Sequence, residues 1–262
     1  MIRTKKSLGQ NFLTDKNVLE KIVNIVEIKN KTVLEVGPGS GNLTSYILNQ
    51  KPKKIYVVEK DTNLVSILNN DFKDQLTIIN DDILNIEEYL ISKEKLTVFG
   101  NLPYNISTEI LCKWILNFND DNFWFDHLIL MFQKEVADRI IAKFNTSAYG
   151  RLSLISNWKL EIKKILDVKP ESFSPKPKID STLLLFSPKK KFIKIKNPQS
   201  LEKISRVFFN HRRKMLKRPF NQLFNGNLDI LERLKINLNL RPQNLDFDTY
   251  YLLANEYEKL IS

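Results

Sequence analysis

The stretch 98–108, VFGNLPYNIST, combines groups that a plain loop would not need. An apolar run stops at Gly100, and Asn101, Leu102, Pro103 and Tyr104 follow directly. They offer an amide, a stiff backbone and a flat ring side by side. Pro103 biases Leu102 to an extended conformation, which helps to fix the direction of the Leu102 carbonyl. The turn can therefore present hydrogen-bond acceptors and an aromatic face to a bound molecule.

A glycine-rich turn lies upstream, in VLEVGPGSGNLT at 33–44. The pattern predicts a strand, a tight turn that lets the backbone approach a ligand, and a helix whose N-terminus offers free N–H groups. Glu59 follows Gly41 by 18 residues, at the tip of the next strand. An acid there can accept hydrogen bonds from both hydroxyls of a ribose. The spacing favours a cofactor that contains a nucleoside, and an ordinary strand–turn–helix loop is the alternative.

The glycine spacing separates two classes of cofactor. Dinucleotide sites carry Gly-x-Gly-x-x-Gly, whereas Gly37 to Gly41 form Gly-x-Gly-x-Gly, preceded by Glu35. This form is similar to the cofactor loop of S-adenosylmethionine-dependent methyltransferases, and it disfavours an NAD-dependent dehydrogenase. A third strand ends in IINDDIL, where Asp81 or Asp82 can bind the exocyclic amine of the cofactor adenine.

The elements that must position these groups alternate between strands and helices. Two more strands, Lys159–Leu166 and Ser181–Phe186, are joined by a proline-rich loop and are expected to close the sheet as an antiparallel pair. The alternation is typical of an α/β fold with a mostly parallel sheet and helices on both faces. The pattern predicts strands at 32–36, 54–58, 75–80, 95–99 and 127–132, and helices at 15–28, 41–50, 61–70, 106–118 and 133–144.

Charge is concentrated near the C-terminal end of the chain. The 262 residues carry a formal net charge of +11. Between Ser187 and Phe220 there are 12 basic residues and one acid, Glu202. Although a bias towards lysine in the coding sequence inflates the basic count, four arginines cluster within 13 residues of this segment. We therefore expect a polyanionic partner, most simply a nucleic acid, rather than a merely solvated face.

Composition excludes several other classes of protein. No apolar run approaches the roughly 20 residues of a membrane-spanning helix, and the N-terminus lacks the apolar core of a secretory signal. Cys112 is the only cysteine, and His127 and His211 are the only histidines, so we expect neither an internal disulfide nor a bound metal. A reducing cytoplasm is the simplest location, and we expect a monomer.

Seven motifs, in order over residues 7–220, resemble the ribosomal RNA adenine dimethyltransferase family. The resemblance is greatest to the bacterial branch that dimethylates two adjacent adenosines near the 3′ end of small-subunit (16S) rRNA during ribosome biogenesis. Residues after about 222 carry little signature. The motifs are LGQNFL (8–13), EVGPGSGNLT (35–44), NLPYNIST (101–108), QKEVADRI (133–140), YGRLS (149–153), FSPKPKIDS (173–181) and FFNHRRKML (208–216).

The resemblance implies a Rossmann-like class I methyltransferase sheet, mostly parallel with an antiparallel last strand. The pattern along the chain changes after Pro188, and we therefore expect a methyltransferase domain at 1–186 and a basic linker with a small all-α RNA-docking domain at 187–262. The resemblance implies S-adenosylmethionine as the cofactor and the rRNA or the immature 30S ribosomal particle as the partner. Of the acid pair it selects Asp82, and the cofactor positions that carry over are Asn11, Leu13, Gly37, Glu59, Asp82 and Asn101.

The implied reaction explains the NLPY turn. The exocyclic amine of adenine is a poor nucleophile because its lone pair is delocalised into the ring. Acceptors at the Asn101 side chain and the Leu102 carbonyl would draw the amine towards tetrahedral geometry, and Tyr104 would stack on the base. No strong general base is needed, so catalysis would rest on orientation and dipoles. Phe173 is expected on the other face of an unstacked base, and Phe12 is expected to help close the site. Packing in the core is the alternative for both rings.

The basic segment is predicted to dock the RNA. Its arginines and lysines are expected on one helix, where residues 206, 213 and 217 would share a face. Arginine forks grip phosphates bidentately, which lysine cannot do. The predicted RNA-binding residues are Arg206, Arg212, Arg213, Lys214 and Lys217.

Three other functions are compatible with parts of this pattern. An Erm-type enzyme of large-subunit rRNA would usually carry Ile in place of Leu102. A DNA adenine methyltransferase would more often show Asp or Ser before Pro-Pro-Tyr. A non-catalytic RNA-binding assembly factor would not need the intact glycine turn, Glu59 and the Asn101–Tyr104 run.

Overall fold

The fold was analysed in a computed structural model that describes residues 11–117 and 122–261. Residues 8–10 of the LGQNFL motif and Phe118, the expected end of the 106–118 helix, lie outside the described residues. The densest contacts divide the chain into two compact units. Of the described residues, the first unit contains 11–110, 122–137 and 162–188, and the second contains 111–117, 138–161 and 189–261. The second unit thus draws on three chain segments, whereas the sequence pattern suggested a single boundary near residue 186.

A seven-stranded sheet forms the centre of the first unit, with the strand order β4-β3-β2-β5-β6-β9-β7. The first five of these strands pair in parallel, and β9 pairs antiparallel with β6. This confirms the expected α/β class with an antiparallel last strand. The strands are β2 (Thr32–Val36), β3 (Lys54–Val58), β4 (Thr77–Ile79), β5 (Leu96–Gly100), β6 (Phe125–Gln133), β7 (Leu160–Val168) and β9 (Ser181–Pro188).

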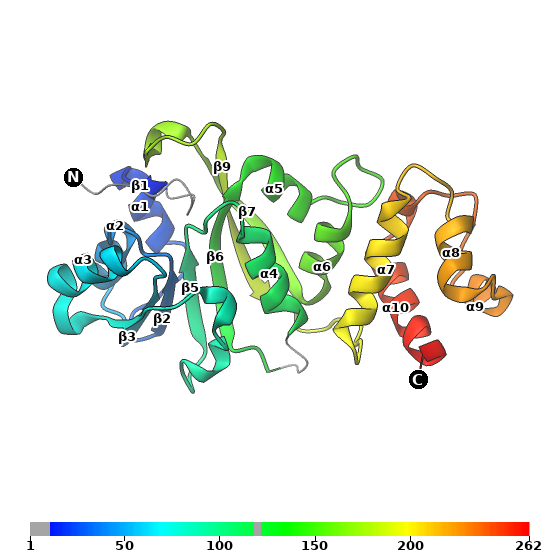
Figure 1. Cartoon of the computed structure of the whole chain (residues 1–262), viewed down its shortest axis with the longest axis horizontal. Helices are drawn as coiled ribbons and strands as arrows, with labels where there is room; N and C mark the ends of the chain where they lie inside the picture. The colour runs from blue at the N-terminus through cyan, green and yellow to red at the C-terminus, as the bar shows by residue number, and fades with distance from the viewer. Residues whose placement is uncertain (1–10, 118–121, 262) are drawn as a thin grey trace. The chain divides into compact units, whose positions relative to one another are not determined.

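Helices α1, α2 and α3 lie beside β2 and β3 (Figure 1). Asp15 caps α1 (Lys16–Val23) and Asp61 caps α3 (Thr62–Phe72), because each carboxylate accepts hydrogen bonds from N–H groups of the first turn. Helix α2 (Asn42–Asn49) starts directly after the glycine turn. Apolar residues of α1 and α2 pack with strand residues such as Val33, Val57 and Ile129 in one buried core. The glycine turn connects β2 to α2, so this packing of α2 on the sheet sets the position of the turn.

A short two-stranded sheet ties the start of the described chain to its middle. Strand β1 (Phe12–Leu13) pairs antiparallel with β8 (Phe173–Ser174). Thr14 reinforces the pairing, because its backbone N and Oγ1 both donate to the Ser172 carbonyl. This sheet fixes the position of residues 11–13, which line the site described below.

The second unit is mainly helical. Its segments include α6 (Arg151–Lys159), α7 (Pro198–Asn210), α8 (Lys217–Phe224), α9 (Leu228–Arg233) and α10 (Phe247–Ile261). Helix α8 ends at Phe224, and a 3₁₀ turn covers Pro242–Asn244 before α10 begins. Two helices cross from the first unit into the second, α4 (Ser107–Leu116) and α5 (Lys134–Ile140). In the described part of the chain, no helix combines the length and apolar composition that crossing a membrane requires.

Candidate active site

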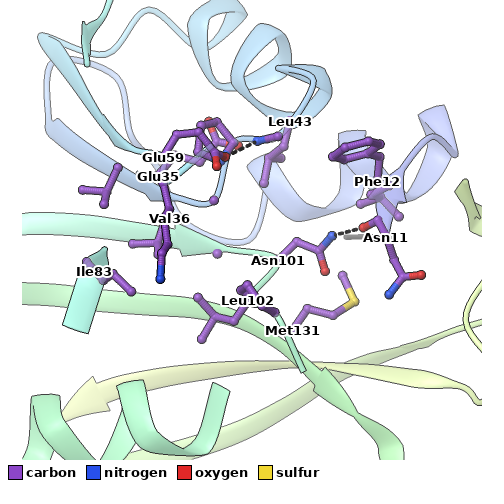
Figure 2. Close-up of a pocket in the computed structure, with 18 of the residues that line it drawn as sticks. Asn11, Phe12, Glu35, Val36, Leu43, Glu59, Ile83, Asn101, Leu102 and Met131 are labelled. Carbon is purple, nitrogen blue, oxygen red and sulfur yellow. Dashed lines mark hydrogen bonds between the residues drawn. The ribbon is translucent and has the colours of Figure 1, made fainter. Parts of the chain in front are cut away.

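A cavity of about 240 Å³ lies at the carboxyl ends of strands β2, β3, β4 and β5. Ligands of open parallel sheets bind at this edge, because the loops that follow neighbouring strands meet there. The predicted site residues that line the cavity are Asn11, Leu13, Gly37, Glu59, Asp82, Asn101, Leu102 and Tyr104. The structure therefore brings together residues that are far apart in the sequence, and Figure 2 shows several of them around the same space.

The glycine turn lies close to an aromatic ring on one side of the cavity. Gly37 and Gly39 have φ angles of +68° and +58°, in the left-handed region that favours glycine. A Cβ atom on Gly39 would lie 2.7 Å from the ring of Phe12. Any side chain at Gly39 would thus collide with Phe12, which itself lines the cavity. The ring of Phe12 and the glycine turn therefore line the same part of the cavity.

Glu59 is a buried carboxylate that faces the cavity from the end of β3. Its two oxygens accept hydrogen bonds from the backbone N of Gly39, at 3.2 Å, and of Asp61, at 2.8 Å. Burial raises the pKa of Glu59 above its usual value, and these bonds oppose the shift. The two backbone hydrogen bonds hold the side chain in place. Because each carboxylate oxygen has two acceptor positions, Glu59 can still accept hydrogen bonds from the hydroxyls of a ligand.

A second carboxylate, Glu35, lies deeper at the end of β2 and also lines the cavity. It accepts a 2.6 Å hydrogen bond from Oγ1 of Thr44. Burial raises the pKa of Glu35 to about 7, helped by the charge of Glu59 and opposed by the bond from Thr44. The site thus contains one carboxyl group that titrates close to neutral pH.

At the end of β4, Asp82 is held in place from two directions. Its side chain accepts a hydrogen bond from the backbone N of Leu84, so Asp82 caps the 3₁₀ turn Ile83–Asn85. It also accepts a hydrogen bond from Nζ of Lys60 at 2.7 Å. Asp81 also lines the cavity, but its carboxylate accepts from the backbone N of Asp82 and from Asn85. Both acids lie at the cavity, and Asp82 carries the ion pair to Lys60.

The side chain of Asn101 has a defined orientation. Its Nδ2 donates to the backbone carbonyl of Asn11 at 2.8 Å, and its oxygen is directed away from Asn11 towards Met131 (Figure 2). The amide is thus oriented as a hydrogen-bond acceptor on the cavity side. The next residue, Leu102, is buried. Pro103 follows and opens a turn that precedes α4, in which Ile106 N donates to the Pro103 carbonyl.

Tyr104 is anchored through its hydroxyl. Its Oη lies 2.5 Å from Oγ of Ser181, the first residue of β9. Ser181 is fully buried, so the hydroxyl pair lies inside the protein while the Tyr104 ring lines the cavity. Burial raises the pKa of Tyr104, and the bond from Ser181 opposes the shift. A neutral, fixed ring of this kind offers a face for stacking a planar group.

A search for related proteins assigns the family. The model of the family described as "Ribosomal RNA adenine dimethylase" matches residues 1–259. The chain belongs to the ribosomal RNA adenine dimethylase family. The match runs over both units, and so includes the helical segments where the sequence offered few motifs.

Individual members of the rRNA adenine dimethylase family match along nearly the whole chain. Ribosomal RNA small subunit methyltransferase A of Pelagibacter ubique is 65% identical over 259 residues, which cover 99% of this chain and 98% of that protein. The protein of the same name from Wolbachia pipientis wMel is 40% identical and covers 100% of this chain and 91% of its own length. A dimethyladenosine transferase from Plasmodium falciparum has a similar crystal structure, with a TM-score of 0.79 and 27% identity over 95% of this chain and 98% of that one.

One predicted site residue, Phe173, is not among the residues that line the cavity. It is only 3% exposed and belongs to the hydrophobic core with Leu13. In the pairing of β8 with β1, Phe173 lies opposite Leu13, which does line the cavity. The stacking role of Phe173 stays a prediction.

The prediction that the basic residues share one helix is wrong. Helix α7 ends at Asn210, a turn follows in which Lys214 N bonds the His211 carbonyl, and α8 begins at Lys217. Pro219 in the first turn of α8 lacks an N–H, so a helix continuing from α7 would lose a backbone bond there. The turn between α7 and α8 holds Arg212, Arg213 and Lys214, whereas Arg206 lies on α7 and Lys217 opens α8.

Three contacts at the site were not foreseen from the sequence. They are Ser181 against Tyr104, Lys60 against Asp82, and the Asn11 carbonyl against Asn101. Ser181 ends the FSPKPKIDS motif, but nothing in the motif connects it with a tyrosine 77 residues earlier. The described residues include no group of three or more His, Cys, Asp or Glu side chains that could hold a metal ion.

Proposed function

We propose that the protein uses S-adenosylmethionine to dimethylate the exocyclic amines of two adjacent adenosines near the 3′ end of small-subunit rRNA. The observation that carries this proposal is the orientation of Asn101, whose amide is held by the Asn11 carbonyl so that its oxygen faces the cavity. Family membership supplies the reaction class, and the names of the two bacterial relatives described above support the choice of the small subunit.

The cavity suits this cofactor. Glu59 is placed to accept hydrogen bonds from two ribose hydroxyls, and Asp82 from the amine of the cofactor's adenine. Gly37 and Gly39 lack a Cβ and adopt positive φ angles, so the backbone of the turn can approach the cofactor closely. The cofactor's sulfonium supplies an electrophilic methyl group when it is bound. The residues proposed to hold the cofactor are Asn11, Leu13, Gly37, Glu59, Asp82 and Asn101.

The chain's own groups prepare the target amine. Asn101 Oδ1 and the Leu102 carbonyl accept hydrogen bonds from its two hydrogens, which directs the nitrogen lone pair towards the methyl donor. The Tyr104 ring stacks on the base, and Ser181 keeps that ring in place. The amine loses its proton readily once it is alkylated, so no strong base is required. Orientation and fixed dipoles carry the catalysis.

We further propose that Arg206, Arg212, Arg213, Lys214 and Lys217 bind phosphates of the rRNA or the immature 30S particle. Residues 187–262 would then serve mainly in docking and residues 1–186 in chemistry. The segment from 189 to 214 carries clustered arginines, which suit bidentate phosphate contacts. The protein would act as a monomer in the cytoplasm, where the ribosome is assembled.

Methyl transfer to rRNA from cells that lack the protein tests this proposal. Purified wild-type protein, S-adenosylmethionine and small-subunit particles should yield dimethyladenosine, measured by mass spectrometry of the digested RNA. Asn101→Ala should lower turnover by about 100-fold or more, while the other five proposed residues still hold the cofactor with weakened affinity. If the wild-type protein binds rRNA but transfers no methyl group, the chain is a binding factor and the proposed reaction is wrong.

A further inference from the structure

The loop between α5 and α6 presents an aromatic side chain to solvent. Phe144 is 44% exposed, although large aromatic residues are usually buried. The neighbouring loop residues Lys143, Asn145 and Ser147 are also exposed. All the contacts described below lie within the second unit.

This loop is held in one conformation by contacts from two distant segments. Asn145 has a φ of +67°, and its backbone N donates to the Gln243 carbonyl at 2.8 Å. The Asn145 side chain accepts from Nδ2 of Asn244, also at 2.8 Å. Arg212 donates from its guanidinium to the carbonyls of Thr146 and Ser147. The loop is therefore clamped from both sides, by 243–244 and by the turn after α7.

The end of the loop is anchored in an aromatic cluster. Tyr149 is fully buried, and its ring packs edge-to-face against Phe209 at 5.7 Å and Phe247 at 5.2 Å. Thr146 adds a turn of its own, since its Oγ1 donates to the Lys143 carbonyl at 2.6 Å. A ring exposed on so constrained a loop loses little conformational entropy when it binds a partner.

The chain segments that meet at this loop carry a net positive charge, and the nearest acid along them, Asp246, lies two residues beyond and acts on Tyr149. The three segments that meet here, 143–147, 211–214 and 241–244, contain Lys143, Arg212, Arg213, Lys214 and Arg241, and no acidic residue. An exposed aromatic ring among cations is the combination that binds unpaired nucleotides, because bases stack on the ring while the cations neutralise phosphates.

We infer that Phe144 stacks on an unpaired base of the rRNA and that the cations around it hold the adjoining phosphates. The inference rests on the proposed function, since it takes rRNA as the partner, and it assigns the second unit a contact with single-stranded or bulged RNA. The stack tolerates any base, because every base offers a π-face. Phe144 thus acts in docking and has no part in methyl transfer.

Binding of the full-length protein to two small-subunit rRNA fragments tests this inference. One fragment contains unpaired nucleotides, and the other is fully paired and of equal length. Phe144→Ala should weaken binding to the first about 5- to 100-fold with an unchanged salt slope, because stacking and not charge is lost. Phe144→Tyr should bind like the wild type. Tyr89→Ala is the matched control, since Tyr89 is 58% exposed but follows Glu87 and Glu88, and it should change nothing.

The proposal is overturned if Phe144→Ala binds both fragments as the wild type does, or if it loses affinity equally for both. It is also overturned if Phe144→Ala weakens binding only to the assembled particle, which would identify a ribosomal protein as the partner. These measurements need no methyl transfer. A wild-type protein that fails to methylate rRNA would count against the proposed function alone.

Discussion

The hydroxyl oxygens of Tyr104 and Ser181 lie 2.5 Å apart, across 77 residues of sequence. Ser181 is the first residue of β9, where it pairs with Gln133 of β6. The hydrogen bond therefore connects the NLPY turn to the antiparallel strand of the sheet. The bond holds the hydroxyl of Tyr104 inside the protein, while the residue lines the cavity.

Ser181→Ala should lower methyl transfer because the Tyr104 ring loses its anchor, and Tyr104→Phe should lower it to a similar degree. Each single change leaves one buried hydroxyl without its partner, which destabilises by about 1–3 kcal/mol. The double variant removes both hydroxyls, so its losses should be smaller than the sum of the single losses. Turnover and urea unfolding of all four proteins measure this coupling, and strictly additive effects would show that the bond does not position the ring.

Glu59→Ala should weaken S-adenosylmethionine binding by about tenfold or more, because two charge-assisted hydrogen bonds to the ribose are lost. Glu59→Gln keeps one acceptor oxygen and should bind with intermediate affinity. Glu94→Ala is the control, since Glu94 bonds Thr32 and Lys53 at the other end of the sheet strands. Calorimetry with the cofactor decides the matter, and equal affinities for wild type and Glu59→Ala would remove Glu59 from the site.

Glu35 should make the stability of the protein depend on pH. Its pKa is about 7 in the folded state against an ordinary value of 4.5. Between these values the unfolded chain releases its proton first, so this group lowers the free energy of unfolding as the pH rises from 4.5 to 7. Glu35→Gln keeps an acceptor for Thr44 and cannot ionise. The free energy of unfolding of Glu35→Gln, measured relative to that of the wild type, should therefore increase by up to about 3 kcal/mol as the pH rises from 4.5 to 7.

Urea unfolding of wild type and Glu35→Gln at pH 5 and pH 7.5 measures the effect. Glu59 is present in both proteins, so its own titration largely cancels in the difference. A stability difference that stays constant with pH would show that Glu35 keeps an ordinary pKa.

Arg212 and Arg213 should behave differently although they are adjacent. Arg213 is exposed, and Arg213→Ala should reduce the salt slope of RNA binding by roughly 0.7–0.9 log units without changing the melting temperature. Arg212 also donates to the carbonyls of Thr146 and Ser147, so Arg212→Ala should lower the melting temperature as well. Lys53→Ala, which removes a cation paired with Glu94, serves as the charge control. An unchanged slope in Arg213→Ala would place the phosphate contacts elsewhere.

The parallel part of the sheet could be predicted because each strand is a short apolar run with a clear turn after it. The bounds of β2 and β3 agree with the prediction residue by residue. Helix α6 was missed because its sequence has no amphipathic period. Ser153, Leu154, Ile155, Ser156 and Trp158 are all buried, so apolar and polar residues do not separate onto two faces.

The cofactor side of the site was easier to predict than the contacts that hold it. Gly37, Glu59 and Asp82 follow consecutive parallel strands, and strand order alone brings such residues together. The partners of Asn101 and Tyr104 depend on where β1 and β9 come to lie. The motif alone also does not reveal that Phe173 is buried in the core opposite Leu13, because that depends on the pairing of β8 with β1.

The pairing of β1 with β8 has a consequence for how the protein is made. The bond from Thr14 to Ser172 spans 158 residues, and contacts of such sequence separation form late because a long loop must close first. On the ribosome, residues 11–13 have no partner strand until residues 173–174 have been synthesised. We therefore expect the nascent chain to be unable to retain its cofactor until β8 has emerged, so ligand binding cannot assist the folding of the first half of the sheet.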